Sequence, residues 1–253
     1  MLFTRSRTNP VFYEEELRRQ LADQPERLRQ ALEEPANADF LTWNVFMSLD
    51  THSDAPWLAH VLQLVGGSAV GPPVRISLWS GRHRQPLLRP SPAYLRFIEQ
   101  RAETAGAQEC SLELFSTPVE VPVRLESPDV LALIDTTITA APLGIGGRDR
   151  LVELVDAGIE HARRLSKSLT VAMVYAEDTP AGRDVAARVD ELATPARLAA
   201  ALPWRERLPV VTILGVTWRE LLDRWQEEQT YLAVGGEPVR GFLSHCAKHG
   251  LRR

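Results

Sequence analysis

Apolar residues recur at helical spacing in the first 66 residues of the chain. In residues 10–32, leucines lie near helical spacing among glutamate, arginine and glutamine, which predicts a polar-rich helix. A second helix is expected to begin at Asp39, whose side chain suits the N-cap position. Its apolar stripe comprises Phe40, Trp43, Phe46 and Met47. A third helix is expected over residues 57–65, because the apolar pattern stops at Gly66.

From residue 74 onward, short runs of β-strand type alternate with helical patterns. Strands are predicted at residues 74–79, 109–115, 119–126, 130–138 and 169–175. Helices are predicted at residues 91–105, 148–165, 181–201 and 217–225, the last with Thr217 as its cap. Residues 208–213 fit either a strand or an extended segment. No repeat or low-complexity linker divides the sequence. It therefore predicts one α/β domain over residues 1–253, with a helical part (1–66) and a core (72–253) in which helices flank a mixed central sheet.

Composition and charge exclude some classes of partner. Hydrophobic residues at 44% and charged residues at 25% are ordinary for a globular protein. The formal net charge of -4 gives no global attraction to nucleic acid or to anionic membranes, so such contacts need a local basic patch. No apolar run approaches the length of a membrane span, and the N-terminus lacks the apolar stretch of a signal peptide. These features predict a bacterial cytoplasmic protein with no membrane partner.

Cysteine and histidine positions suggest little metal chemistry. Cys110 and Cys246 are far apart, which argues against a disulfide framework or a zinc site. His245 and His249 are four residues apart and could share one face of a metal site on a helix. The sequence favours an ordinary amphipathic helix end, because no second ligand pair is evident.

Residues 119–138 have the pattern of a β-hairpin with an acidic residue near the outer end of each strand. Side-chain alternation places four apolar residues on one face of the first strand: Val119, Val121, Val123 and Leu125. Glu120 and Pro122 then lie on the other face, roughly across from Asp135 and Thr137. Glu120 and Asp135 are thus expected to approach one point, as an oxygen-bound divalent cation requires. Pro122 indicates an edge, a bulge or a strand end, because proline cannot donate to the ladder.

This hairpin resembles that of the PD-(D/E)XK nuclease superfamily, in its bacterial stand-alone form. In that family an Asp closes the first strand and Glu-x-Lys follows on the second. The matching positions here are Pro122, Asp135 and Thr137, with Glu120 at the auxiliary acidic position. The resemblance extends in order over about residues 40–225. It also includes residues 41–46, 78–79, Pro92, Tyr94, 148–150, 156–158 and 214–218. It implies a restriction-endonuclease-like fold.

Two of the matching positions lack the groups that the family's chemistry requires. In an intact site the carboxylates hold Mg²⁺, which stabilises the transition state and helps activate water, and the lysine orients or deprotonates that water. Asp135 can replace the usual glutamate, but Pro122 offers no side-chain oxygen and Thr137 no cationic charge. Some relatives carry the lysine on a neighbouring helix. Lys167 would lie roughly 28 Å along the helix predicted from residue 148, so we do not expect it to serve.

Basic residues near the hairpin have two interpretations. Arg148 and Arg150 could contact phosphate at the start of a helix, where backbone N–H groups favour anions, or could form ion pairs with Asp135 or Glu153. Glu120 and Asp135 are accordingly either a residual metal pair or polar residues neutralised by neighbouring arginines. A second group could form a basic aromatic patch or a solvated loop: Arg82, His83, Arg84 and Arg89, with Trp79 and Tyr94.

The sequence therefore predicts a degenerate PD-(D/E)XK-like protein. We expect it to be catalytically impaired or inactive and to act as a nucleic-acid- or protein-binding module. The alternative is an active endonuclease that uses Glu120 and Asp135 with Mg²⁺ as cofactor. A third hypothesis is an interaction or assembly subunit without nucleic-acid contact.

Overall fold

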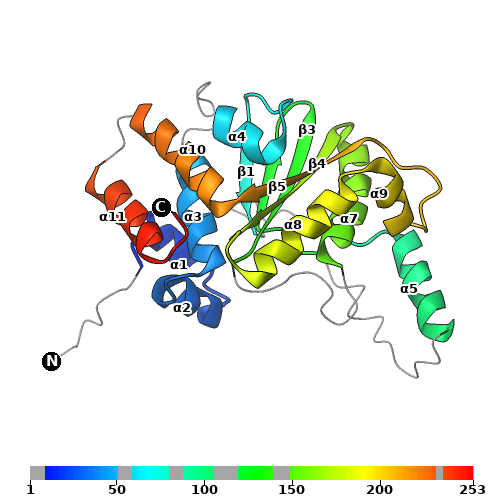
Figure 1. Ribbon diagram of the computed structural model, residues 1–253, viewed down its shortest axis with the longest axis horizontal. Coiled ribbons are helices and arrows are strands. Elements are labelled where there is room, and N and C mark those ends of the chain that lie inside the picture. The colour runs from blue at the N-terminus through cyan, green and yellow to red at the C-terminus, as the bar shows by residue number, and fades with distance from the viewer. Residues whose placement is uncertain are drawn as a thin grey trace.

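A five-stranded mixed sheet flanked by helices forms the centre of the protein (Figure 1). The computed structural model describes residues 9–50, 59–79, 88–104, 119–138, 149–231 and 236–252. The predicted α/β class, with a mixed sheet between helices, is confirmed. The strand expected at residues 109–115 lies outside the described residues. None of the helices in these ranges combines the length and the apolar character that a membrane span needs.

The strands lie in the sheet in chain order. They are β1 (Arg75–Leu78), β2 (Val123–Glu126), β3 (Val130–Thr136), β4 (Ser168–Tyr175) and β5 (Val211–Thr217). The first three form an antiparallel meander, whereas β4 and β5 run parallel to β3. Parallel neighbours need crossover connections, which α7 (Arg150–Leu165) supplies from β3 to β4, and α8 (Pro180–Leu192) with α9 (Pro195–Ala201) from β4 to β5. The carboxyl ends of β3, β4 and β5 therefore meet at one edge of the sheet.

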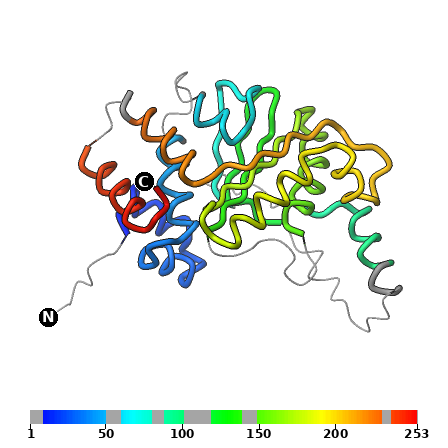
Figure 2. The backbone as a smooth tube through the Cα atoms, viewed as in Figure 1, coloured from blue at the N-terminus to red at the C-terminus, as the bar shows by residue number. Residues whose placement is uncertain are grey.

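Helices cover both faces of the sheet, so it has a hydrophobic core on each side. One face is covered by α7, α8 and α9. The other is covered by α1 (Glu14–Gln20), α2 (Pro25–Glu33), α3 (Ala38–Asp50), α4 (Ala59–Gly66), α10 (Trp218–Tyr231) and α11 (Glu237–Lys248). In Figures 1 and 2, α1, α2 and α11 gather at one end, and α5 (Pro92–Thr104) lies at the opposite end beside α9. Side chains alternate between the two cores along β3. Ala132 and Ile134 pack in the core that includes α3 and α4, whereas Leu131 and Leu133 pack in the core that includes α7.

Helix starts follow local chemistry, and three were predicted well. The Tyr94 N–H donates to Ser91 Oγ at 3.1 Å at the start of α5. Thr217 and Glu220 cap α10 reciprocally, because the Glu220 N–H donates to Thr217 Oγ1 and the Thr217 N–H donates to Glu220 Oε2. Asp149 caps α7 by accepting from the Val152 N–H at 3.1 Å. These caps satisfy N–H groups that have no partner within the helix.

The N-terminal part differs from the prediction in two respects. The single helix expected over residues 10–32 is two helices, because α1 ends at Gln20 and α2 starts at Pro25, whose ring suits only the first turn of a helix. Asp39 does not cap α3. The Phe40 N–H donates to Asn37 Oδ1 at 3.0 Å instead, and the Asp39 carboxylate binds Arg27. Asp39 lies inside the first turn of α3, because the helix begins one residue earlier than predicted, at Ala38.

Candidate functional site

The hairpin that suggested a function is regular only near its turn. Strand β2 begins at Val123, which pairs with Ile134, so the next position outward brings Pro122 opposite Asp135. The Pro122 carbonyl accepts from the Trp79 N–H at 3.0 Å, on the side of β1. The first strand is therefore shorter than predicted and ends where its proline lies. Of the three alternatives predicted for Pro122, an edge, a bulge or a strand end, the structure shows a strand end.

The apolar side chains on the two sides of Pro122 point to opposite faces of the sheet. Val123 and Leu125 belong to the core beneath α3 and α4. Val119 and Val121 belong to the core beneath α7. The prediction that all four share one face is wrong, because the bend at Pro122 interrupts the alternation that a continuous strand would impose.

Asp135 lies at the carboxyl end of β3 and is held by Arg150. Its side chain is on the same side as Leu133, facing α7, and the residue is only 7% exposed. Asp135 Oδ2 accepts from Arg150 Nε at 2.9 Å, and Oδ1 accepts from the Thr136 N–H at 3.1 Å. The same guanidinium donates from Nη2 to the carbonyl oxygen of Glu120. Arg150 therefore joins the two strands of the hairpin through one side chain.

The carboxylate of Glu120 points to a different arginine. Arg27 Nη1 lies 2.7 Å from Glu120 Oε1, and Arg27 also binds both oxygens of Asp39, at 2.6 and 2.8 Å. Its guanidinium stacks over the ring of Trp79, 4.9 Å from the ring centroid. Burial alone would lower the pKa of Arg27, but Asp39 and Glu120 outweigh this effect and the pKa is raised. Arg27 thus carries a permanent positive charge between two carboxylates.

Arg150 contacts both the Asp135 carboxylate and the backbone carbonyl of Glu120. The carboxylates of Glu120 and Asp135 nevertheless bind cations from opposite faces of the sheet. Asp135 binds Arg150 of α7, and Glu120 binds Arg27 of α2, which packs on the other face of the sheet. Together with Asp39, three carboxylates are interleaved with two guanidinium groups. Of the two interpretations of these acidic residues, ion pairing with arginine is the one found in this structure. No group of three or more metal-ligating side chains occurs within the described ranges.

Thr137, at the position of the family's lysine, is engaged through its backbone. The residue is 6% exposed. Its N–H donates to the Val174 carbonyl at 2.8 Å, and its carbonyl accepts from Trp218 Nε1 at 3.0 Å. The neighbouring Thr136 hydroxyl lies on the other face, 3.0 Å from the Thr42 hydroxyl of α3. These backbone contacts fix the end of β3.

Lys167 lies at the other end of the sheet from Asp135. Its Nζ donates to Glu126 Oε1 at 2.9 Å and to the Ser127 carbonyl at 2.6 Å, beside the hairpin turn. The length of β3 separates this turn from Asp135 by roughly 15 Å or more. The expectation that Lys167 does not replace the missing lysine agrees with this position.

The remaining predicted site residues are only partly described. Arg148, Cys110, Arg82, His83 and Arg84 lie outside the described residues. Arg89 is exposed. The rings of His245 and His249 are 4.6 Å apart, and His245 Nε2 lies 2.9 Å from the Pro35 carbonyl oxygen. Neither histidine belongs to a cluster of three metal ligands in the described part of the chain.

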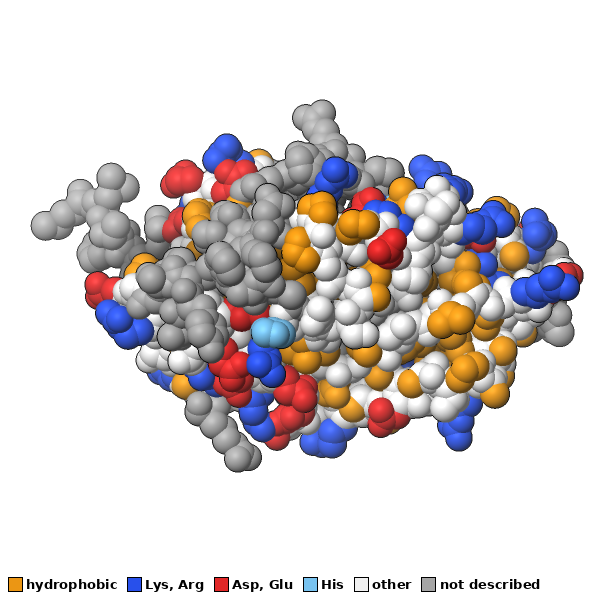
Figure 3. All heavy atoms as spheres, turned by 90° about the horizontal axis from the view of Figure 1, so that it is seen from above, with side chains coloured by type: hydrophobic (Ala, Val, Ile, Leu, Met, Phe, Trp, Pro, Cys, Tyr) orange, Lys and Arg blue, Asp and Glu red, His pale blue; other side chains and the backbone are white. Residues whose placement is uncertain are grey.

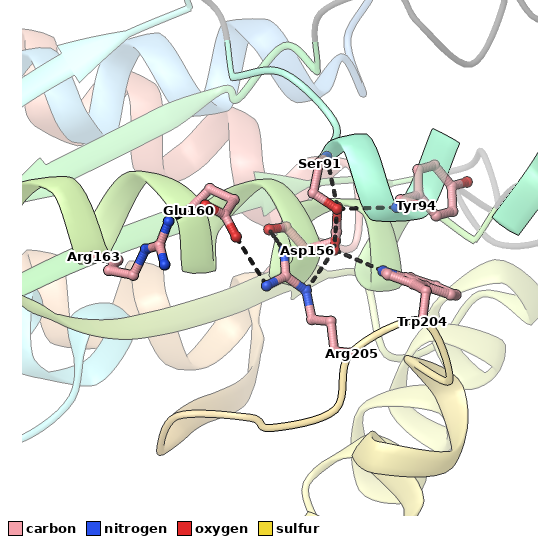
Figure 4. Close-up of polar contacts among 7 residues, drawn as sticks. All are labelled: Ser91, Tyr94, Asp156, Glu160, Arg163, Trp204 and Arg205. Carbon is pink, nitrogen blue, oxygen red and sulfur yellow. Dashed lines mark hydrogen bonds and ion pairs between the residues drawn. The ribbon is translucent and has the colours of Figure 1, made fainter. Parts of the chain in front are cut away.

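A buried carboxylate on α7, Asp156, forms a second polar network that sequence reasoning did not find (Figure 4). Asp156 is fully buried and accepts hydrogen bonds from the Ser91 backbone N–H, Trp204 Nε1 and Arg205 Nε, at 2.9, 2.8 and 2.6 Å. The Ser91 hydroxyl lies 3.1 Å from the same carboxylate. The start of α5, the middle of α7 and the segment after α9 thus meet at one charge. Such a saturated network is a structural anchor.

The surface mixes charges of both signs. In Figure 3, basic and acidic side chains lie next to one another around the rim of one face, and uncharged side chains cover much of its middle. Many arginines in the described ranges have acidic partners, as in the pairs Arg29–Glu26 and Arg219–Asp178. This arrangement agrees with the negative formal charge and makes any anion-binding region local.

Comparison with known proteins gives no relative from which a function could be transferred. No protein family matches the chain, and no characterised protein or solved structure is found to be similar to it. The nuclease superfamily therefore stays a resemblance of motifs.

Proposed function

We propose that this chain is a degenerate PD-(D/E)XK-like protein that does not cleave phosphodiester bonds and serves as a binding module. One observation carries the proposal: the guanidinium of Arg150 is bound to Asp135, at the position where the family's chemistry would need a metal ion. A metal bound there would have to compete with a cation that is covalently part of the protein. Glu120 is paired to Arg27 in the same way.

The order of helices and strands supports the proposed likeness to the PD-(D/E)XK superfamily. Residues 41–46 fall in α3, residues 78–79 at the end of β1, and Pro92 and Tyr94 in α5. Arg150 and residues 156–158 fall in α7. Residues 214–218 span the end of β5 and the start of α10. Each segment of the resemblance thus coincides with the end or body of a regular element, around one mixed sheet.

Nucleic acid is the partner class that we propose, with a protein partner as the alternative outcome. Arg150 is the first residue of α7, and about one fifth of its side chain is exposed. A phosphate could share this guanidinium with Asp135, because arginine has five N–H donors. Such contacts are electrostatic and should weaken steeply with salt.

The binding proposal is tested by a salt titration of duplex and single-stranded oligonucleotides with the wild-type chain, Arg150→Ala and Arg163→Ala. Arg163 is an exposed α7 arginine paired with Glu160, so it controls for loss of charge far from Asp135. We expect salt-sensitive binding that weakens in Arg150→Ala and is kept in Arg163→Ala. Absence of binding at low salt would reject nucleic acid and leave a protein partner as the function of the module.

A further inference from the structure

A second region rich in cations lies at the turn end of the hairpin, away from Asp135. A pocket of about 440 Å³ is bordered there by residues 73–75, by residues 126–128 and by Lys167. Three basic side chains meet near it: Arg75 of the edge strand β1, Arg124 of β2 and Lys167 after α7. These cations lie close together in a chain whose formal net charge is -4.

The negative charge of Glu126, the acidic residue in this pocket, is compensated by neighbouring cations. Glu126 Oε1 accepts from Lys167 Nζ at 2.9 Å and Glu126 Oε2 accepts from Arg124 Nη2 at 2.6 Å. Burial alone would raise the pKa of Glu126, but Lys167 and Arg124 outweigh it and the pKa is lowered. Burial lowers the pKa of the nearby His161, and the charge of Arg124 lowers it further, whereas Glu126 acts in the opposite direction. Both carboxylate oxygens of Glu126 are thus paired with cations.

Hydrogen-bond donors are left over in the same pocket. Lys167 has three N–H donors and uses two of them, on Glu126 and on the Ser127 carbonyl. Within the described part of the chain, the exposed side chain of Arg75 has neither a hydrogen-bond nor an ion-pair partner, so its five N–H donors face solvent. Arg75 lies directly opposite Glu126 in the β1–β2 register, which brings it beside the Lys167 pair.

We propose that this pocket binds a phosphoryl group, with Arg75 as the forked donor and Lys167 as the fixed point charge. Phosphate suits the site because it offers several acceptor oxygens to a planar guanidinium and to an ammonium at once. The phosphoryl group could belong to a small phosphorylated ligand or to a nucleic-acid backbone. This inference does not depend on the proposed function, because it uses neither Asp135 nor Arg150.

The test is a calorimetric titration of the full chain at low ionic strength, first with inorganic phosphate and then with a short DNA duplex. Arg75→Gln removes the forked donor from an exposed position on an edge strand, so the fold should be kept. Arg163→Gln, an exposed arginine of α7 outside the pocket, is the matched control. We expect the dissociation constant to rise at least about tenfold in Arg75→Gln and to change less than about twofold in Arg163→Gln.

Each outcome of these titrations either supports or overturns the proposed phosphoryl site. Arg75-dependent binding of inorganic phosphate supports a site for small ligands, and Arg75-dependent binding of the duplex alone supports a site for backbone phosphate. Equal weakening by both substitutions, or no binding of either probe by the wild-type chain, overturns the proposal. Phosphate binding that weakens in Arg150→Ala but not in Arg75→Gln would place the contact at α7 and overturn the pocket proposal. Lys167→Gln is a second variant for the same titrations, and thermal melting checks that this variant keeps its fold.

Discussion

Arg150 Nε lies 2.9 Å from Asp135 Oδ2, and the same guanidinium donates to the carbonyl oxygen of Glu120. An internal cation thus compensates the charge of the Asp135 carboxylate. The pair is largely shielded from water, since the Asp135 and Arg150 side chains are 9% and 22% exposed. Interactions between such groups are stronger than those of surface ion pairs.

This ion pair should be measurable as a coupling energy. In a double-mutant cycle with Asp135→Asn and Arg150→Gln, we expect the effects on the free energy of unfolding to be non-additive by about 1–3 kcal/mol. The measurement is chemical denaturation of the four proteins. A coupling below about 0.5 kcal/mol would mean that the two groups do not depend on each other.

A second prediction concerns Gly182, at the start of α8, where two backbone segments lie close together. A Cβ added to Gly182 would lie 1.9 Å from the Ala176 carbonyl oxygen, so the backbone would have to move. Gly182→Ala should therefore lower the free energy of unfolding by about 2 kcal/mol or more. Gly241 of α11 is the matched control, because a Cβ there meets no atom within 4 Å. Gly241→Ala should be neutral or stabilising by roughly 0.5–1 kcal/mol, and a similar loss in both variants would contradict the steric argument.

The Asp156 network predicts a large effect of a small change. Asp156→Asn keeps the size of the side chain but removes the charge that faces Arg205, whose side chain is only 10% exposed. The amide nitrogen would also face the donors that now bind the carboxylate. We expect a loss of about 3–5 kcal/mol in the free energy of unfolding. Asp178→Asn, at an exposed carboxylate, should cost less than about 1 kcal/mol. Similar losses from the two substitutions would show that Asp156 is no anchor.

A buried glutamate should make stability depend on pH. Glu228 is 2% exposed and accepts from the Val61 N–H at 3.0 Å, and burial raises its pKa from 4.5 to about 7. The folded state therefore holds this proton more tightly than the unfolded state. The resulting stability is complete below about pH 4.5 and is lost as the pH rises to about 7.

Glu228→Gln removes this loss and can keep the hydrogen bond from Val61. We expect the variant to be more stable than the wild-type chain by about 1–3 kcal/mol at pH 8, with a much smaller difference at pH 5. Thermal melting of both proteins across this range measures the effect. An equal difference at pH 5 and pH 8 would show that ionisation of Glu228 is not its cause.

Local patterns predicted most of the elements, because capping and alternation depend on near neighbours, but α11 was not among the predicted helices. Ser91 and Thr217 were placed correctly at helix starts, and the strand pattern of residues 169–175 matches β4. The sequence pattern predicted a strand or extended segment that stops at residue 213. Strand β5 continues to Thr217, because it pairs with β4 up to that residue. Such pairing is a property of the sheet and is not written in the local pattern.

The site was harder to predict than the fold. The sequence pointed to Asp135 and, as one of two interpretations, to its pairing with Arg150. It gave no sign of Arg27, which comes from a helix about 90 residues before Glu120 and reaches it only through packing. It also placed Glu120 and Asp135 on a common face, which assumed a regular strand through Pro122. A proline within a short strand was the available signal that this assumption fails.

We propose that the pairing of Arg150 with Asp135, together with Pro122 and Thr137 at two of the matching positions, leaves no working nuclease centre. The most direct test incubates purified wild-type chain and Asp135→Asn with single- and double-stranded DNA and RNA, in Mg²⁺ and in Mn²⁺. We predict that every substrate stays intact with both proteins. Metal-dependent cleavage by the wild-type chain that disappears in Asp135→Asn would contradict this account and establish an active endonuclease.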